Sequence, residues 1–282
     1  DEFCLVINEA PSENYVTDIA KRVLDVLQDP IAIDGRTLAI STSIGITFSL
    51  VDGVSAASLL QNADLAMYKA KGGGKNNYHV FNHQLHKDAD SRMALEEELR
   101  SAVENEEFVL YYQPQIDLKS GKLIGCEALI RWQHPTYGLL DPADFIAIAE
   151  ESGLIIPIGT WVLKRACQIG ADLINNHQQT CIAVNISAKQ LKHPEFYNTL
   201  TRSLSESKFP AMLLELEITE SCFLEDMDIV ISLLNKIRQL GVAIALDDFG
   251  TGFSSLNYLR KLPVDYLKID LEHLIEKFEW KK

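Results

Sequence analysis

The chain has 282 residues, of which 47% are apolar, and its formal net charge is −14. This length allows one large domain or two smaller ones, and the apolar fraction is sufficient for a hydrophobic core. The acidic balance argues against a surface for polymeric nucleic acid, which needs a basic stripe. It still allows a small phosphate ligand, provided that metal ions offset the acids.

The five cysteines are scattered and include no Cys-x-x-Cys pair, which predicts a reducing cytoplasm rather than a disulfide-stabilised fold. No run approaches the roughly 18 apolar residues of a membrane span, and no signal peptide is recognisable. Because the chain begins Asp-Glu-Phe and not with methionine, we expect a fragment of a longer parent. An anchor in the inner membrane, carried by an upstream part, therefore stays open for that parent.

Residues 1–81 have the pattern of an α+β domain. Helical periodicity covers 12–28, with Ser12 as the expected N-cap, and also 57–71. Short apolar runs predict strands at 4–8 and 78–81, and Asp34-Gly35 indicates a hairpin. Residues 82–107 are polar and helical, with an apolar stripe of Leu95, Leu99 and Val103, which predicts a helical linker.

From residue 108 the pattern changes to short apolar strands that alternate with helices. The predicted strands are 108–116, 123–132, 181–187, 213–219, 242–248 and 266–270, and helices are predicted at 145–151, 161–174 and 227–240. This alternation favours parallel α/β packing, although the short turn at 119–122 makes the first two strands antiparallel. We expect a β/α barrel, with an open doubly wound sheet as the alternative.

Polar side chains stand at the ends of successive predicted strands: Glu127, Asn185, Glu217, Asp247 with Asp248, and Lys268. In a β/α barrel these ends meet at one mouth, where active sites lie. All but the lysine are oxygen donors, which favour Mg²⁺ or Mn²⁺, and the acids carry enough charge for two ions. Two such ions can promote displacement at phosphorus, with Lys268 holding or activating the attacking water or stabilising phosphate charge.

Each of these residues also has an ordinary structural explanation. A single glutamate at a strand end is usually solvated or paired, and Asn185 can bond a neighbouring backbone group. The Asp247-Asp248 pair before Phe-Gly-Thr-Gly can form a turn, and Lys268 can form a surface salt bridge. The pattern by itself therefore leaves the metal site and the structural explanation open.

Five motifs carry a resemblance to a known family: YYQPQIDLKSGKLIGCEALIRWQHP (111–135), AVNISAKQL (183–191), LELEITES (214–221), LDDFGTGFSSLNYL (246–259) and LPVDYLKID (262–270). In this order they resemble the EAL family of cyclic di-GMP phosphodiesterases. The resemblance implies a modified β/α (TIM-like) barrel whose first strand is antiparallel. It also implies hydrolysis of cyclic di-GMP to linear pGpG, and a homodimer formed through the barrel.

The resemblance also implies roles for individual residues. Glu127, Asn185, Glu217, Asp247 and Asp248 would be metal ligands, with Asp247 bridging two ions, and Lys268 would position or activate water. Glu220 would anchor the loop that follows the two aspartates. Gln113 and Arg131 would contact the dinucleotide, Arg131 through phosphate.

Residues 1–81 resemble the C-terminal half of a GGDEF (diguanylate cyclase) domain, through DEF (1–3), SIGIT (43–47) and ADLAMYKAKGGGKNNY (64–78). Asp1 and Glu2 match the signature acids. Because half of that fold cannot assemble a cyclase site, we expect no diguanylate cyclase activity from this fragment.

The EAL resemblance ends near Asp270, and residues 271–282 have the pattern of a helix. The family barrel has two further strands, so we expect 108–282 to be a truncated EAL domain with impaired hydrolysis. The alternative is a non-catalytic module that binds cyclic di-GMP or regulates a partner.

Overall fold

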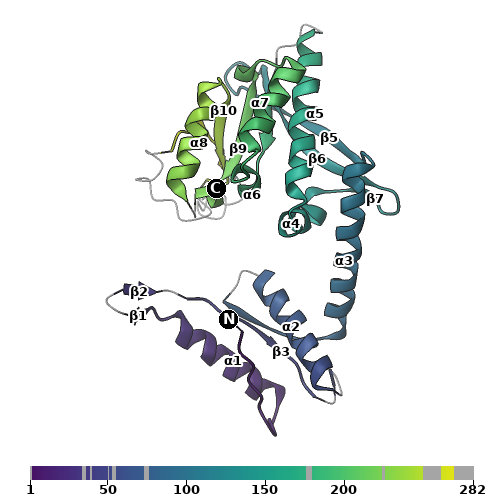
Figure 1. Ribbon diagram of the computed structural model, residues 1–282, viewed down its shortest axis with the longest axis vertical. Coiled ribbons are helices and arrows are strands. Elements are labelled where there is room, and N and C mark those ends of the chain that lie inside the picture. Colours follow the sequence, from purple (N-terminus) through teal and green to yellow (C-terminus); the bar gives the residue numbers. More distant parts are fainter. Residues whose placement is uncertain are drawn as a thin grey trace, which may run out of the picture. The chain divides into compact units, whose positions relative to one another are not determined.

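A computed structural model of the chain describes residues 2–33, 36–38, 40–49, 51–52, 55–72, 76–175, 180–223, 226–249 and 262–269. The chain divides into two compact units, Asp1–Ala94 and Leu95–Lys282 (Figure 1). Several predicted features lie outside the described residues: Asp1, the Asp34-Gly35 turn, the Gly-Thr-Gly loop after Phe249, and the helix over 271–282. Among the helices described, none is long and apolar enough to cross a membrane.

Unit 1 contains helices α1 (Glu13–Gln28) and α2 (Ala56–Gly72) and two strand pairs. The hydroxyl of Ser12 accepts a hydrogen bond from the Tyr15 amide at 3.2 Å, so the predicted N-cap is confirmed. Strands β1 (Ile31–Ile33) and β2 (Arg36–Leu38) form an antiparallel pair, as the hairpin prediction requires, and β3 (Ser43–Ile46) pairs in parallel with β4 (Asn77–Val80).

The strand predicted at 4–8 is wrong. These residues are in no strand, and most of them are exposed. An apolar run forms a strand only where its backbone groups can hydrogen-bond to a neighbouring strand. The composition of the run does not show whether such a neighbour exists in the fold.

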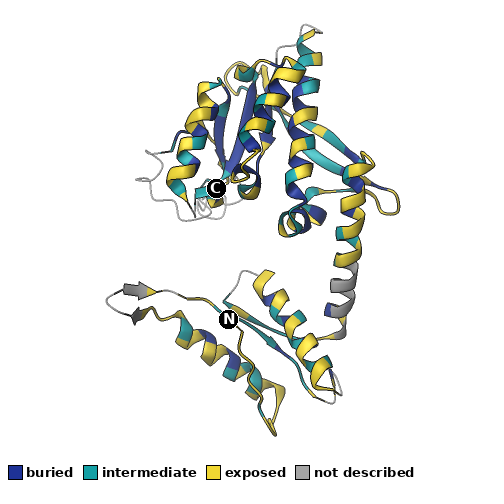
Figure 2. Cartoon of the chain, in the orientation of Figure 1, coloured by how far each residue is buried: buried dark blue, intermediate teal, exposed yellow. Residues whose placement is uncertain are grey.

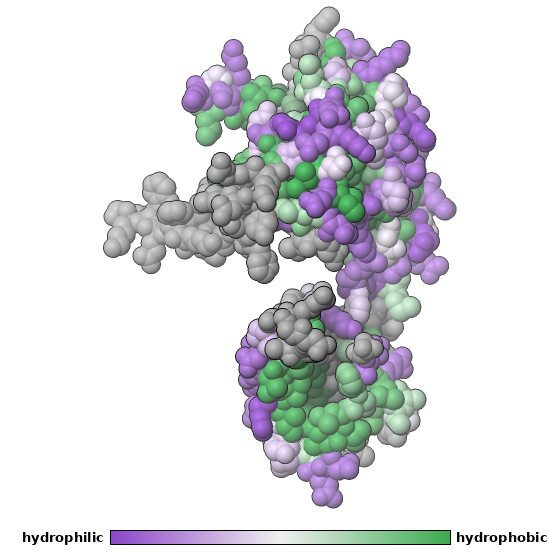
Figure 3. Space-filling model, turned by 60° about the vertical axis from the view of Figure 1, so that its left-hand side comes forward, coloured by the Kyte–Doolittle hydropathy of each residue, from purple (hydrophilic) through white to green (hydrophobic). Residues whose placement is uncertain are grey.

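The core of unit 1 is small. Among its described residues, the buried cluster consists of Ala66, Phe81 and Leu85. Large apolar side chains remain exposed, among them Phe3, Val6 and Val26, and Figure 3 shows apolar surface gathered on this unit. Burial of apolar area is the main stabilising contribution to folding. In the described part of the chain, the core cluster of unit 1 is much smaller than that of unit 2.

Helix α3 (His83–Glu104) covers most of the predicted linker. Its last turns belong to unit 2, where Leu99 and Ala102 are fully buried in the core. Just after the helix, Glu107 Oε2 accepts a hydrogen bond from the indole Nε1 of Trp132 at 3.0 Å. The end of this helix is therefore an integral part of the unit 2 core.

Unit 2 is built on one sheet in the strand order β11-β10-β9-β8-β6-β5, with β7 paired to β6. The strands are β5 (Phe108–Ile116), β6 (Leu123–His134), β7 (Gly138–Leu140), β8 (Cys181–Asn185), β9 (Leu214–Thr219), β10 (Ala243–Asp247) and β11 (Tyr266–Leu267). The β5–β6 pair is antiparallel and the sheet continues in parallel from β6 to β11, as predicted.

The helices of unit 2 are α4 (Pro142–Ser152), α5 (Ile155–Asn175), α6 (Ala188–Leu191), α7 (Phe196–Ser207) and α8 (Met227–Gln239), with short 3₁₀ helices at Ala211–Leu213 and Glu220–Phe223. Figure 2 shows the central strands buried, with helices whose outer faces are exposed. Nearly continuous burial of β9 is typical of a parallel strand covered on both faces. The sequence analysis did not predict β7, α6 or α7.

Candidate active site

Strand register brings the predicted site residues to one face of the sheet. Glu217 of β9 pairs with Asn185 of β8 on one side and with Ala245 of β10 on the other. Glu127 of β6 pairs with Ala183 of β8. Because paired residues share a face and alternate residues along a strand return to it, these side chains point the same way.

The same rule extends the face to the last described strand. Asp247 follows Ala245 by two residues, and Lys268 follows Tyr266, the partner of Ala245, by two. The amide of Lys268 donates to Leu246 O at 2.8 Å, which continues the pairing with β10 beyond the end of β11. The lysine is thereby directed into the group of acids.

Five of the predicted residues form one contact network. The ammonium group of Lys268 lies 2.6 Å from Glu217 Oε2, 3.0 Å from Glu127 Oε2 and 3.7 Å from Asp247 Oδ2. The other carboxylate oxygen of Glu127 accepts a hydrogen bond from Asn185 Nδ2 at 2.7 Å. Residues from β6, β8, β9 and β10 therefore converge on Lys268, which directly follows β11.

Glu217 is the buried member of this network, with 1% of its surface exposed. Burial raises the pKa of its carboxyl to about 7, although the neighbouring Lys268 ammonium opposes this change. Among the described residues, its Oε1 has no hydrogen-bond donor. A buried carboxylate oxygen without a donor is what a bound cation would satisfy.

Lys268 is held in its charged form. Burial by itself lowers the pKa of its amine, but hydrogen bonds and charge from Glu217 and Glu127 outweigh this effect and raise the pKa. Within the described residues, no three histidine, cysteine or acidic side chains are grouped so that they could hold a metal ion. The Lys268 ammonium instead lies among the three carboxylates of Glu127, Glu217 and Asp247.

The donor set nevertheless fits a divalent cation in its chemistry. It supplies three carboxylates and one amide oxygen, with no sulfur or imidazole, which suits Mg²⁺ or Mn²⁺. The specific observation in favour of a bound cation is Oε1 of Glu217, which is buried and has no donor within the described part of the chain.

Asp247 and Asp248 differ in burial and in backbone conformation. Asp247 is the last residue of β10 and is partly buried, whereas Asp248 is exposed and has φ of 54°. This left-handed conformation, which aspartate tolerates better than most residues, ends the strand. The Asp248 amide donates to Asp247 Oδ1 at 3.0 Å and so helps to orient that carboxylate.

The remaining predicted residues lie outside the network. Gln113 of β5 is paired with Glu127 and is exposed. Glu220 directly follows β9 at the start of a 3₁₀ helix, and the loop that it was predicted to anchor is outside the described residues. Arg131 lies further along β6, where its Nε is 2.8 Å from Asp141 Oδ1.

The sequence analysis missed Asp141, which contacts Arg131, and Tyr111, whose ring lies under the same guanidinium group. The sequence feature that could have placed Asp141 near Arg131 is β7, a strand of three residues that pairs antiparallel with β6. So short a strand carries almost no periodicity and is easily overlooked.

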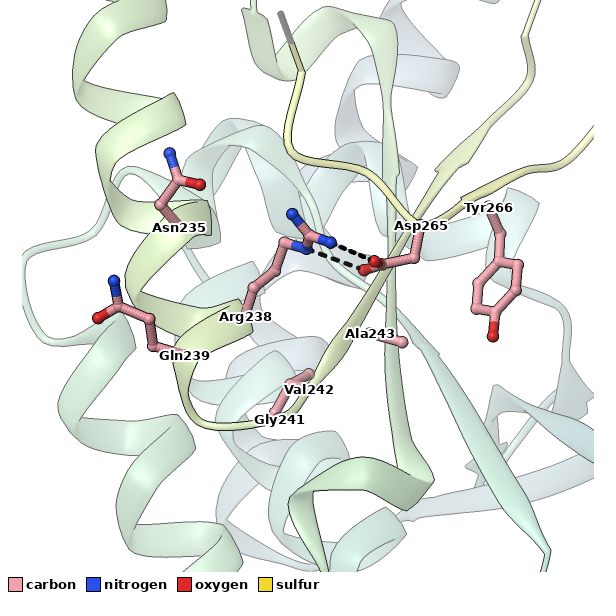
Figure 4. A pocket seen from close by; sticks show the side chains of 8 residues that line it. All are labelled: Asn235, Arg238, Gln239, Gly241, Val242, Ala243, Asp265 and Tyr266. Atoms are coloured by element: carbon pink, nitrogen blue, oxygen red, sulfur yellow. Dashed lines mark hydrogen bonds and ion pairs between the residues drawn. The ribbon is translucent and has the colours of Figure 1, made fainter.

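A pocket of about 430 Å³ lies at the other end of β10, at Ala243. Figure 4 shows that Arg238 and Asp265, which line it, point toward each other; their two contacts measure 3.2 and 2.5 Å. Asp265 also accepts a hydrogen bond from the Ile244 amide, so this ion pair joins α8 to β10. This pocket is not the candidate site, because its charges are already paired and it lies at the opposite end of β10 from Asp247.

Comparison with protein families assigns both units. The model of the EAL domain matches residues 96–279. The chain belongs to the EAL domain family. The model described as "Diguanylate cyclase, GGDEF domain" matches residues 1–77, so the chain has the tandem arrangement that its motifs predicted.

Curated relatives of this GGDEF/EAL chain include cyclic di-GMP phosphodiesterase NbdA of Pseudomonas aeruginosa, 39% identical over 98% of this chain and 35% of the relative. The bifunctional diguanylate cyclase/cyclic di-GMP phosphodiesterase MucR of the same organism is 40% identical over 96% of this chain and 39% of its own length. Cyclic di-GMP phosphodiesterase PdeR of Escherichia coli is 38% identical over 96% and 40%. The chain thus spans well under half of the length of these relatives.

Solved EAL structures resemble the described fold. The cyclic di-GMP complex of the PaMucR phosphodiesterase is 41% identical, with a TM-score of 0.61, over 66% of this chain and 75% of that chain. The EAL enzyme Bd1971, bound to cAMP and cyclic di-GMP, is 34% identical, with a TM-score of 0.63, over 80% and 60%. The sheet of unit 2 therefore belongs to the TIM-like barrel fold of EAL domains, with an antiparallel first strand as predicted.

Proposed function

We propose that this EAL unit hydrolyses cyclic di-GMP to linear pGpG in a metal-dependent reaction. Water adds to one phosphorus, the bond to the 3′ oxygen of the ribose breaks, and the product carries a 5′ phosphate and a free 3′ hydroxyl. The observation that carries the proposal is the convergence of Glu127, Asn185, Glu217 and Asp247 on Lys268. The names of relatives such as NbdA and PdeR support the choice of substrate.

Glu127, Asn185, Glu217, Asp247 and Asp248 would hold one or two divalent cations. When bound, such cations polarise a phosphoryl oxygen and lower the pKa of water. Glu217 suits this role because it is buried and, among the described residues, its Oε1 has no hydrogen-bond donor. Asp247, whose carboxylate is oriented by the Asp248 amide, would contribute oxygen ligands and negative charge to the bound cations.

Lys268 would contact the attacking water and the phosphate of the substrate rather than a metal ion. Its raised pKa keeps the amine charged at neutral pH, so its natural role is to hold the attacking water by a hydrogen bond and to stabilise negative charge on the phosphate. Gln113 and Arg131 would contact the dinucleotide, and Glu220 would support the loop that follows Asp248.

The test is conversion of cyclic di-GMP to pGpG by the purified chain with Mg²⁺ or Mn²⁺, followed by chromatography. We expect Asp247→Asn to reduce turnover at least about 100-fold, since it removes charge where the transition state needs it. Asp228→Asn is the matched control, because it changes an exposed aspartate on α8 of the same unit and should leave turnover unchanged.

A folded chain that binds cyclic di-GMP without turnover would contradict the proposal and support the non-catalytic module. Equal turnover by Asp247→Asn and the parent chain would refute the placement of the site.

Two further expectations belong to the proposal. All five cysteines are free, which supports a reducing cytoplasm. A homodimer through the EAL barrel is supported by the family resemblance, and analytical ultracentrifugation of the chain would test it.

A further inference from the structure

The side chain of Arg131 is held on three sides. Its Nε is 2.8 Å from Asp141 Oδ1, and its Nη1 donates to the backbone oxygen of Ile130 at 2.8 Å. Its guanidinium carbon lies 5.7 Å from the centroid of the Tyr111 ring, within cation–π range. Only 19% of the arginine side chain is exposed, so these contacts and the surrounding residues restrict its orientation.

This arrangement follows from three neighbouring antiparallel strands. Leu140 of β7 pairs with Trp132 of β6, so the next residue along, Asp141, comes to lie beside Arg131. On the other edge of β6, Val109 of β5 pairs with Arg131, and Tyr111 is the diagonal neighbour two residues on. Local strand pairing thus places a carboxylate and an aromatic ring on opposite sides of one guanidinium group.

The backbone of Asp141 is held independently of the arginine. Its amide donates to Asp144 Oδ2 at 3.1 Å at the start of α4, with Pro142 as the first helical residue. The Asp141 carboxylate is therefore carried on a rigid corner between β7 and α4.

The held guanidinium group keeps donors available for a ligand. Of its five N–H groups, the contacts with Asp141 and Ile130 use two, which leaves three. Arg131 shares the odd-numbered face of β6 with Glu127, so these donors lie on the side of the sheet that carries the acids.

We propose that Asp141 and Tyr111 are positioning residues that fix Arg131 for binding of the cyclic dinucleotide. The inference rests on the proposed function and extends it to two residues outside the acidic network. Asp141 holds the Nε edge and Tyr111 supports the guanidinium plane, so the remaining donors are presented to a pair of acceptor atoms, for which phosphate oxygens are the best fit. A guanidinium group that is fixed before binding loses less entropy when the ligand arrives.

The experiment measures kcat and KM for cyclic di-GMP in variants of the chain. Asp141→Asn keeps the size of the side chain but removes its charge, and we expect KM to rise about three- to five-fold with kcat nearly unchanged. Asp144→Asn is the matched control: it weakens the same helix start without touching Arg131 and should keep the KM of the parent. At the second position, Tyr111→Leu should raise KM and Tyr111→Phe, which keeps the ring, should not.

A double-mutant cycle separates positioning from a direct contact. If Asp141 acts only through Arg131, Asp141→Asn adds nothing to the KM of Arg131→Ala. An unchanged KM in Asp141→Asn would overturn the inference. A lowered KM would also overturn it, because it would show that Asp141 competes with substrate for the guanidinium group. If the parent chain shows no turnover, the proposed hydrolase fails, and dissociation constants for cyclic di-GMP in the same variants decide the inference.

Discussion

Tyr112 provides a sharp test of the packing in unit 2. Its hydroxyl is buried and has no hydrogen-bond partner among the described residues. Burial is the largest cause that raises its pKa to about 12. The ring itself packs against the core, and its partner across the β5–β6 pair is Ala128, on the opposite face from Glu127. The hydroxyl thus loses its hydration on folding and gains nothing in return.

Tyr112→Phe should therefore stabilise unit 2. A buried polar group without a partner costs about 1–3 kcal/mol, while the phenyl ring keeps the packing. We expect a gain of about 1 kcal/mol in the free energy of unfolding. With a urea dependence of about 2 kcal/mol/M, this gain moves the unfolding midpoint up by about 0.5 M.

The assay is urea unfolding followed by tryptophan fluorescence, with Tyr111→Phe as the matched control. Tyr111 is the adjacent residue and is 50% exposed, so removal of its hydroxyl should leave the midpoint unchanged. A lower midpoint for Tyr112→Phe would refute the reasoning. It would show that the hydroxyl makes a hydrogen bond whose stabilisation exceeds the free-energy cost of burying the hydroxyl.

Three other outcomes are expected. Gly159→Ala should destabilise unit 2 by about 1–3 kcal/mol in urea unfolding, because its new Cβ would clash with the side chain of Gln190, which is buried and accepts a hydrogen bond from the Ser187 amide. Gly72→Ala meets nothing within 4 Å and should not destabilise the chain. Trp132→Phe should lower the melting temperature, since it opens a cavity and removes the bond to Glu107; an unchanged value would contradict this. A chelator should abolish cyclic di-GMP turnover and added Mg²⁺ or Mn²⁺ should restore it, whereas turnover in excess chelator would exclude the proposed metal dependence.

Local pattern was sufficient for much of the fold. The bounds predicted for β5 match the structure, and those for β6, β8, β9 and β10 are within about two residues, which is the usual uncertainty of strand ends. Alternation of apolar strands and helices depends on neighbours in the chain, so it can be recognised without knowledge of the tertiary structure.

The candidate site was predictable for the same reason. Parallel strands bring their carboxyl ends to one edge, so residues at or near the ends of successive strands, such as Asn185, Glu217 and Asp247, are expected to meet. The sequence alone therefore indicated the family, the antiparallel first strand pair and the residues that contact Lys268 in the structure.

Tertiary structure decided what depends on register between distant strands. It placed the Lys268 ammonium among three carboxylates and buried Glu217 with one oxygen that no described residue donates to. It brought Asp141 to Arg131 through β7, a strand too short to show a pattern, and it left residues 4–8 without a strand partner. Each of these outcomes depends on which residues face each other across a sheet, and that pairing is a property of the folded chain as a whole.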